Sequence, residues 1–286
     1  MTVRSMEWHK GRLYSWNSFP VPSGYRLGDG VFETIRTYGG RAFKLDAHVS
    51  RLMAGAKAIG LQDLPDYDIV VDEILRTLEE RRLEILGEEW ILRPTFFSDS
   101  ASWGFVTPIE SWNPAPDMNK NESISVGISP YIYPGRYLIP PSFEQQVKWL
   151  SRGPLSHALR DAKEKGWEEA LLLDSEQRVI EGTRSNVLLA LEDVIVAAGA
   201  LSGAFPGITR EVVLECARRR GIEIVDRPIS LLELQGSREL LLTSTLLGIA
   251  PVASIIVGKN LFNKPTGEIS RLLLFDFDNE ISKESH

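Results

Sequence analysis

The chain has 286 residues, 43% of them hydrophobic and 25% charged, which is typical of an ordinary globular protein with two modest domains. Its formal net charge of −7 argues against nucleic acid or an anionic membrane as the main partner. The single cysteine permits no internal disulfide, and the four histidines are too scattered to predict a metal site. No segment has the apolar length of a signal peptide or a membrane span, so a reducing cytoplasm is the expected location.

The first third of the chain predicts strands and two helices. An alternating apolar pattern is followed by Gly39-Gly40, which is a signal for a hairpin turn. Asp46 is expected to cap a helix whose apolar side chains share one face. The expected elements are, in order, a strand at 31–38, a helix ending at Gly60, a helix at 67–82 and a strand at about 90–97.

A composition shift marks the middle of the chain. Residues 107–145 hold seven prolines, which disfavour regular structure, so part of this stretch is expected to connect two domains. The predicted organisation is a smaller N-terminal α/β domain at 1–130, a connector at 131–145 and a larger C-terminal domain at 146–286.

Helices and strands are also expected to interleave after the connector. The predicted elements are a short helix ending at Gly166, strands at 170–173, 186–191 and 194–198, a helix at 209–220, a strand at 239–243 and a helix at 269–281. The order has no strict βαβ rhythm, which favours an α+β fold over a doubly wound sheet.

Several short patterns that can carry chemistry follow one another along the chain. Taken alone, Lys148 is one of 32 lysine and arginine residues and reads as a solvated charge, and Glu181 reads as an exposed strand-end carboxylate. The patterns are the Gly-Asp-Gly-Val-Phe-Glu run at 28–33, His-x-x-Arg-Leu from His48, Lys148 with the later segments 168–174 and 179–186, the run 205–210 and the run 242–245.

In this order and spacing, the patterns resemble the class IV aminotransferases, which are fold-type IV pyridoxal-phosphate enzymes. That family includes branched-chain aminotransferase, D-amino-acid aminotransferase and 4-amino-4-deoxychorismate lyase. The resemblance runs from about Gly24 to Ser270. It implies a two-domain α+β fold with mixed sheets and flanking helices, pyridoxal 5′-phosphate as cofactor, and a homodimer. Its active site would lie at the domain interface, partly closed by the neighbouring subunit, and residues 146–286 would be the cofactor-binding domain.

The resemblance implies that Lys148 holds the cofactor as an imine. In the family, the lysine precedes a Gly-x-x-Glu-Ala element by a nearly fixed interval, which Lys148 before Gly166 and Ala170 satisfies. Lys163 and Lys165 lie too close to that element and are expected to be solvated. A lysine must be neutral to attack an aldehyde, and burial beside a cationic pyridinium would lower its pKa.

The other cofactor contacts are carried over residue by residue. Glu181 matches the carboxylate that keeps the pyridine nitrogen protonated, which makes the ring a better electron sink. Gly207 opens a helix whose amides would bind the phosphate, with Arg51 adding a charged contact. The implied cofactor-binding residues are Arg51, Lys148, Glu181, Ile208, Thr209 and Thr245.

The sequence leaves the substrate open. The run 89–94 resembles the Tyr-x-Arg-Pro strand of branched-chain aminotransferases, with Ile91 in place of the tyrosine. Residues 151–154 lack the tyrosine that those enzymes carry after the lysine, and this spacing is closer to D-amino-acid aminotransferase and the lyase. Substrate-binding residues are predicted to be Phe32, Arg93, Trp103 and Leu246. Arg184 replaces a small residue, and the sequence does not indicate where its charge points.

Three functions remain as hypotheses. The favoured one is a transaminase that moves an amino group between a small amino acid, branched-chain or other, and a 2-oxo acid. The second keeps the cofactor but is a 4-amino-4-deoxychorismate lyase that releases pyruvate and 4-aminobenzoate. The third is a non-catalytic relative that binds the cofactor or a metabolite. The choice of amino acid, its chirality and the oxo acid are open.

Overall fold

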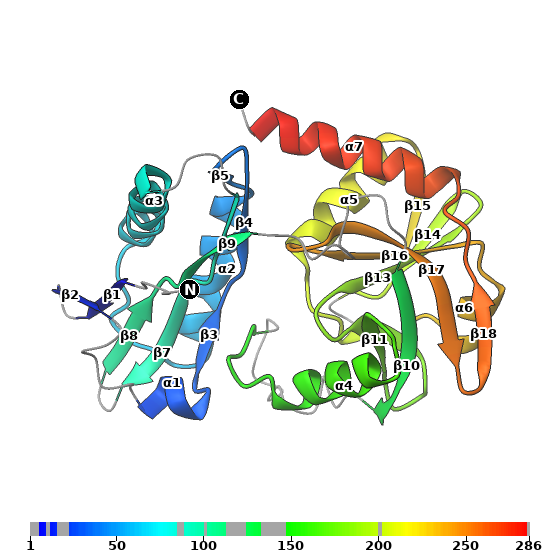
Figure 1. Cartoon of the computed structure of the whole chain (residues 1–286), viewed down its shortest axis with the longest axis horizontal. Coiled ribbons are helices and arrows are strands. Elements are labelled where there is room, and N and C mark those ends of the chain that lie inside the picture. Colours follow the sequence, from blue (N-terminus) through cyan, green and yellow to red (C-terminus); the bar gives the residue numbers. More distant parts are fainter. Residues whose placement is uncertain are drawn as a thin grey trace. The chain divides into compact units, whose positions relative to one another are not determined.

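A computed structural model describes residues 6–9, 12–15, 23–84, 89–99, 102–112, 124–132, 147–199 and 202–284 (Figure 1). The chain forms two compact units, the first within Met1–Asn113, Phe143–Arg152 and Glu284–His286, and the second within Pro114–Ser142 and Gly153–Lys283. Both contain helices and sheets, so the α+β class is confirmed. The boundaries at 130 and 146 stay predictions, and the contacts group Lys148 with the first unit. Among the described residues, no helix has the length and apolar character that crossing a bilayer requires.

The first unit contains two antiparallel sheets. One has the order β2 (Arg12–Ser15), β1 (Met6–His9), β8 (Ser102–Val106), β7 (Thr95–Asp99), β3 (Gly30–Phe32), and the other β5 (Arg41–Ala42), β4 (Ile35–Tyr38), β6 (Glu89–Leu92), β9 (Ile109–Trp112). Its helices are α1 (Ser23–Leu27), α2 (Leu45–Ala58) and α3 (Tyr67–Glu84). Helices α2 and α3 supply buried side chains to a core that also contains Phe96 and Leu92.

The strands expected at 31–38 and 90–97 are each broken in two, and the halves belong to different sheets. The register continues across the break, because Phe32 pairs with Thr95 and Ile35 with Leu92. Pro94 lies at the second break and has no N–H to donate, so it interrupts the ladder there. The prediction of single continuous strands was therefore wrong, and the break falls at Glu33, next to a predicted site residue.

Helix α2 begins at Leu45, earlier than the sequence indicated. Lys44 is its N-cap residue, in a left-handed conformation with φ of 53°, and Asp46 lies inside the first turn. The expectation that Asp46 caps this helix was therefore wrong; its carboxylate instead accepts a hydrogen bond from the Tyr67 hydroxyl at 2.8 Å. The expected end is confirmed, since Gly60 follows the C-cap with φ of 88°, a conformation that glycine adopts without strain.

The second unit is built on a nine-stranded sheet. The order is β12 (Val179–Gly182), β11 (Glu169–Leu173), β10 (Ile124–Ile132), β17 (Gly248–Val257), β16 (Glu239–Ser244), β13 (Asn186–Leu191), β14 (Val194–Ala197), β15 (Glu223–Asp226), with β18 (Asn260–Asn263) beside β17. Its helices are α4 (Gly153–Glu164), α5 (Ile208–Arg219), α6 (Leu231–Gly236) and α7 (Glu268–Glu284). Strand β10 lies inside the proline-rich stretch, where the sequence predicted no strand.

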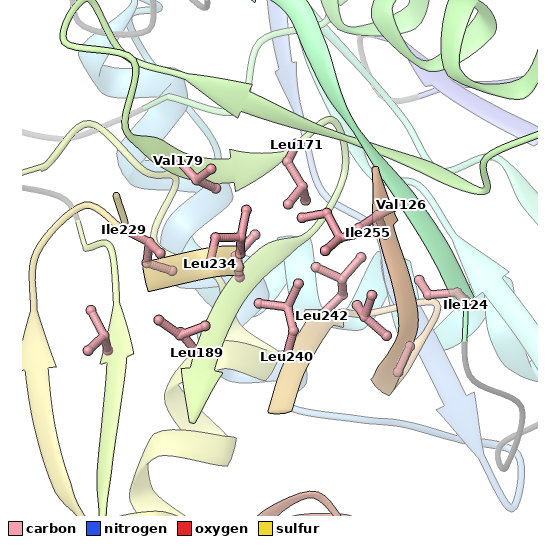
Figure 2. Packing of buried hydrophobic residues seen from close by; sticks show 14 of the residues in the cluster. Ile124, Val126, Leu171, Val179, Leu189, Ile229, Leu234, Leu240, Leu242 and Ile255 are labelled. Atoms are coloured by element: carbon pink, nitrogen blue, oxygen red, sulfur yellow. The ribbon is translucent and has the colours of Figure 1, made fainter. Parts of the chain in front are cut away.

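Six of these strands close into a ring, because β12 pairs with β13 as well as with β11. One apolar cluster takes side chains from all six strands, and Figure 2 shows Leu171, Leu189, Leu242 and Ile255 pointing toward one another. Closing a small sheet in this way buries the inward-facing side chains as a packed core. The ring therefore gives a rigid support to the residues at the ends of its strands.

Candidate active site

Lys148 lies on a short extended segment that pairs with β3. Its carbonyl accepts the amide of Phe32 at 3.0 Å, and the amide of Leu150 donates to the carbonyl of Gly30 at 2.9 Å. A Cβ at Gly30 would meet the carbonyl oxygen of Phe96 and would lie 2.9 Å from the Leu150 side chain. Gly30 is thus required for the close approach of β3 to the backbone of β7, and β3 in turn pairs with the lysine-bearing segment.

The Lys148 side chain lies beside the ring of Phe32. Its Nζ is 5.3 Å from the ring centroid, within the range in which an aromatic face attracts a cation. Both side chains are only partly buried, so reactants can reach the amine. The structure thus brings one predicted pocket residue, Phe32, to the predicted catalytic lysine.

A buried carboxylate fixes the orientation of Arg51. The guanidinium donates from Nε to Glu33 Oε1 at 2.6 Å and from Nη2 to Oε2 at 2.8 Å, which is the two-bonded geometry that arginine and a carboxylate favour. Glu33 is 1% exposed, and His48, three residues before Arg51 on α2, lies 2.8 Å from Oε2. These contacts hold the guanidinium of Arg51 in one orientation beside α2.

The charges of this cluster follow from its partners. Burial acts to raise the pKa of Glu33, but the charge of Arg51 and hydrogen bonds from Arg51 and His48 outweigh it and lower that pKa to about 2. Burial lowers the pKa of His48, although Glu33 acts in the opposite direction. Because an ionised carboxylate only accepts, the neutral His48 ring donates from Nδ1.

Replacing Glu33 with glutamine is expected to lower the free energy of unfolding at pH 7 by about 3 kcal/mol, because a pKa of about 2 instead of 4.5 links ionisation to folding. A lowered pKa stabilises the fold above the unfolded-state value and loses that effect as pH falls toward 2. Urea unfolding at several pH values from 7 to 3 should therefore show that the difference in free energy of unfolding between wild type and variant becomes smaller below about pH 4.5.

The matched control for this substitution is Glu79→Gln. Glu79 is an exposed carboxylate on α3, 59% accessible, and it pairs with Arg82 at 3.3 Å. Its replacement is expected to change stability by no more than about 0.5 kcal/mol. A gap for Glu33→Gln that stayed constant with pH would show that packing, and not charge, makes the contribution.

In the second unit, Glu181 belongs to a row of polar side chains that crosses three strands. Glu181 on β12 lies opposite Asn186 on β13, which lies opposite Thr243 on β16. Residues directly opposite one another in antiparallel strands point to the same face. All three are at most 6% exposed, so this is a buried polar row at one end of the sheet.

The backbone of one residue, Phe205, joins Glu181 to the start of α5. The amide of Phe205 donates to Glu181 Oε2 at 2.8 Å, and its carbonyl accepts the Asn186 side-chain amide at 2.7 Å. Two residues later, Gly207 is the N-cap of α5 in an extended conformation. The two bonds therefore fix the position of the helix start relative to the carboxylate.

The start of α5 has the features of an anion site. No side chain caps this helix, whose first residues are Ile208 and Thr209, so its first amides and its dipole can act on a bound anion. A Cβ at Gly207 would meet Asn186 Oδ1, so only glycine fits there. Thr245 and Leu246 lie in the turn after β16, at the sheet end that also carries the polar row.

The described residues fit the expected cofactor at one further point. The Thr243 hydroxyl is buried and has no hydrogen-bond partner among the residues that the structure describes. A buried hydroxyl without a partner costs free energy, so its presence in the same row as Asn186 and Glu181 favours a polar ligand in this place. In the same described residues, no three metal-binding side chains are grouped to hold a metal ion.

A second buried carboxylate supports the turn that connects Glu181 on β12 to Asn186 on β13. Glu169 is 1% exposed and accepts hydrogen bonds from the backbone and hydroxyl of Thr183 and from the Ser185 hydroxyl. Arg184 extends toward the same group, with Nε 3.8 Å from Glu169 Oε2. The guanidinium of Arg184, whose direction the sequence did not indicate, thus faces the carboxylate of Glu169.

Two predicted substrate residues have other partners in the first unit. Arg93 donates to Glu110 Oε1 from Nη2 at 3.0 Å and from Nε at 3.2 Å, and to the Thr34 hydroxyl from Nη1 at 3.2 Å. Trp103 packs edge-on against Phe96, with its indole nitrogen 3.0 Å from a backbone carbonyl. Their roles at the substrate stay predictions.

Sequence reasoning did not assign Glu33, Thr243 or Glu169. All three lie inside the sequence patterns described above, but a carboxylate or hydroxyl in a motif does not reveal which side chain it will face. Glu169 gave a clearer signal, because a charged residue followed by an alanine and three leucines at the start of a strand is expected to be paired once buried.

Comparisons with known proteins agree with these observations. The family described as "Amino-transferase class IV" matches residues 30–255. A Methanocaldococcus jannaschii protein named "Putative branched-chain-amino-acid aminotransferase" is 32% identical over 255 residues, covering 87% of this chain and 86% of that protein. The D-alanine aminotransferase of Bacillus licheniformis is 26% identical over 279 residues, covering 92% of this chain and 91% of that protein.

Solved structures show the same fold. The Escherichia coli branched-chain amino acid aminotransferase has a TM-score of 0.82 at 21% identity, covering 99% of this chain and 96% of that one. The PLP-bound form of an aminotransferase from Mycobacterium tuberculosis, called hypothetical, has a TM-score of 0.79 at 20% identity, covering 97% of this chain and 99% of that one. At these identities the likeness concerns the fold, and it confirms fold type IV.

Proposed function

Because the chain belongs to the class IV aminotransferase family and is a pyridoxal-phosphate-dependent aminotransferase, we propose that it transfers the amino group of a small amino acid, branched-chain or other, to a 2-oxo acid. The main support for this proposal is the backbone of Phe205, whose amide and carbonyl form hydrogen bonds with Glu181 and Asn186 just before the start of α5. A carboxylate set at a fixed distance from a helix N-terminus suits a ligand with a cationic ring and a phosphate.

We propose that Lys148, Glu181, Arg51, Ile208, Thr209 and Thr245 hold the cofactor. When bound, the cofactor supplies an electrophilic aldehyde and a ring that accepts electrons. The Glu181 carboxylate would hold the ring nitrogen in its protonated form. The first amides of α5, the Thr245 hydroxyl and the fork-oriented Arg51 would bind the phosphate.

Lys148 has two successive tasks in this proposal. Its amine would hold the cofactor in the resting enzyme. With substrate present, the same amine would accept and return the proton that moves between Cα and C4′, as a general base and then a general acid. Its position on a segment bonded to β3 supports both tasks, because the backbone stays fixed while the side chain moves.

Relatives differ in the substrate that their names give. The names of two of them specify branched-chain amino acids and D-alanine, so we propose small amino acids without fixing the chirality. Phe32, Arg93, Trp103 and Leu246 are the proposed pocket residues. From the family we also propose a homodimer and a cytoplasmic location. The lyase alternative is not favoured, since the matched relatives are named as aminotransferases.

The proposal is tested by half-reactions. Purified, cofactor-loaded protein is mixed with single L- and D-amino acids, and the visible absorbance of the lysine-bound cofactor is followed. We expect that band to disappear with at least one small amino acid as the aminated cofactor forms, and to return when a 2-oxo acid is added. A stable band with every amino acid would contradict transamination and make 4-amino-4-deoxychorismate the next substrate to try.

A further inference from the structure

A second cation lies beside the ring that faces the catalytic lysine. Arg152 is partly buried, and its guanidinium carbon is 5.7 Å from the centroid of Phe32, while Lys148 Nζ is 5.3 Å from the same centroid. The pairing of the 147–151 segment with β3 explains this placement. Phe32 lies opposite Lys148, and residues two and four positions along an extended segment return to the same face.

The guanidinium has a chemical consequence for this pocket. It keeps its positive charge at any working pH and is attracted to the face of an aromatic ring. It also presents a planar set of donors that matches a carboxylate. The environment of Phe32 is therefore suited to an anionic group close to the reactive amine.

Arg93, the arginine that the sequence predicted for the substrate, has side-chain partners of its own. Arg93 uses Nε and Nη2 on the Glu110 carboxylate and Nη1 on Thr34, so a substrate carboxylate would compete with Glu110 for it. The Arg152 guanidinium and the Lys148 amine lie against the same ring, that of Phe32.

We propose that Arg152 receives a carboxylate of the substrate next to Lys148. This inference rests on the proposed function, because it takes Lys148 as the reactive amine and Phe32 as a wall of the substrate pocket. It makes Arg152 a specificity-determining residue within the segment 151–154, which lacks the tyrosine that branched-chain aminotransferases carry after the lysine. The carboxylate is either the one on Cα or a second one on the side chain of the substrate.

The experiment measures binding of carboxylates that cannot react. Calorimetry on the cofactor-loaded protein gives the Kd of 4-methylvalerate, which has one carboxylate, of glutarate, which has two, and of 4-methylpentanamide, which is neutral. Arg152→Met is expected to raise the Kd of at least one acid about 10- to 100-fold, the usual effect of losing a charge-assisted hydrogen bond, and to leave the amide within about 2-fold. Arg160→Met, at an exposed position on α4, is the matched control and should change none of the three.

The pattern across the ligands identifies the carboxylate. If the Kd rises equally for both acids, Arg152 binds the carboxylate on Cα. If the Kd rises for glutarate alone, Arg152 binds the side-chain carboxylate. The proposal is overturned if neither Kd rises, if the amide weakens by the same factor, or if the wild type binds no acid. Binding is read without turnover, so a protein that binds acids through Arg152 but shows no half-reaction would contradict the proposed function alone.

Discussion

Replacing Lys148 with alanine is expected to lower the rate of the half-reaction by about 10³-fold or more, because the variant loses both the imine-forming amine and the proton-transferring group. The visible band of the lysine-bound cofactor should also be absent. The fold should persist, since the bond between Phe32 and Lys148 uses the backbone carbonyl, which alanine retains. The measurements are the absorbance spectrum after incubation with cofactor and the single-turnover rate with the best amino acid.

The chain offers matched controls for this substitution in Lys163 and Lys165. Both lie near the end of α4, and Lys165 pairs with Asp161 at 2.7 Å, as expected for solvated helix charges. Alanine at either position should leave the band and the rate unchanged. Added small primary amines should restore part of the rate of Lys148→Ala, because they can take over the proton transfer. A full band in Lys148→Ala, or its loss in Lys165→Ala, would mean that another lysine holds the cofactor.

The sequence predicted well those features that depend on neighbouring residues. Helices α2, α5 and α7 follow from the spacing of apolar residues, and the Gly60 stop follows from local backbone chemistry. The interrupted strands were missed because the alternating pattern is the same on both sides of a bend. Pro94 was the available signal, since a proline in a strand interior is expected to break its ladder.

Residues that act through distant partners were harder to predict. Glu33 and Arg51 stood in two separate patterns, and only the folded β3 and α2 bring their side chains together. The same holds for Arg152, whose relation to Phe32 depends on a pairing between segments far apart in the chain. Family resemblance predicted the roles of Lys148 and Glu181, but the contacts that orient them come from sheet register, which the sequence does not state.

In the proposed site, the charge of Glu181 raises the pKa of the nitrogen in the electron-accepting cofactor ring. An opposite charge at close range shifts a pKa by about 1–3 units, so loss of this carboxylate should lower the pKa of the ring nitrogen by a similar amount. Each unit corresponds to a tenfold change in the protonated fraction once the pKa falls below the working pH. We therefore expect Glu181→Gln to lower the half-reaction rate about 10- to 10³-fold.

The Glu181→Gln variant separates the effect of the negative charge from the effect of holding Phe205 in place. Its side-chain oxygen can still accept the Phe205 amide, so the start of α5 and the affinity for the phosphate should be kept. The cofactor should then bind normally, and the rate should fall with little change in KM, as expected for an effect on the transition state. Glu176→Gln, an exposed carboxylate in the β11–β12 turn, is the control. Equal losses of cofactor affinity and rate would mean that Glu181 acts by holding Phe205 in place, whereas a loss of rate alone assigns its negative charge to the chemistry.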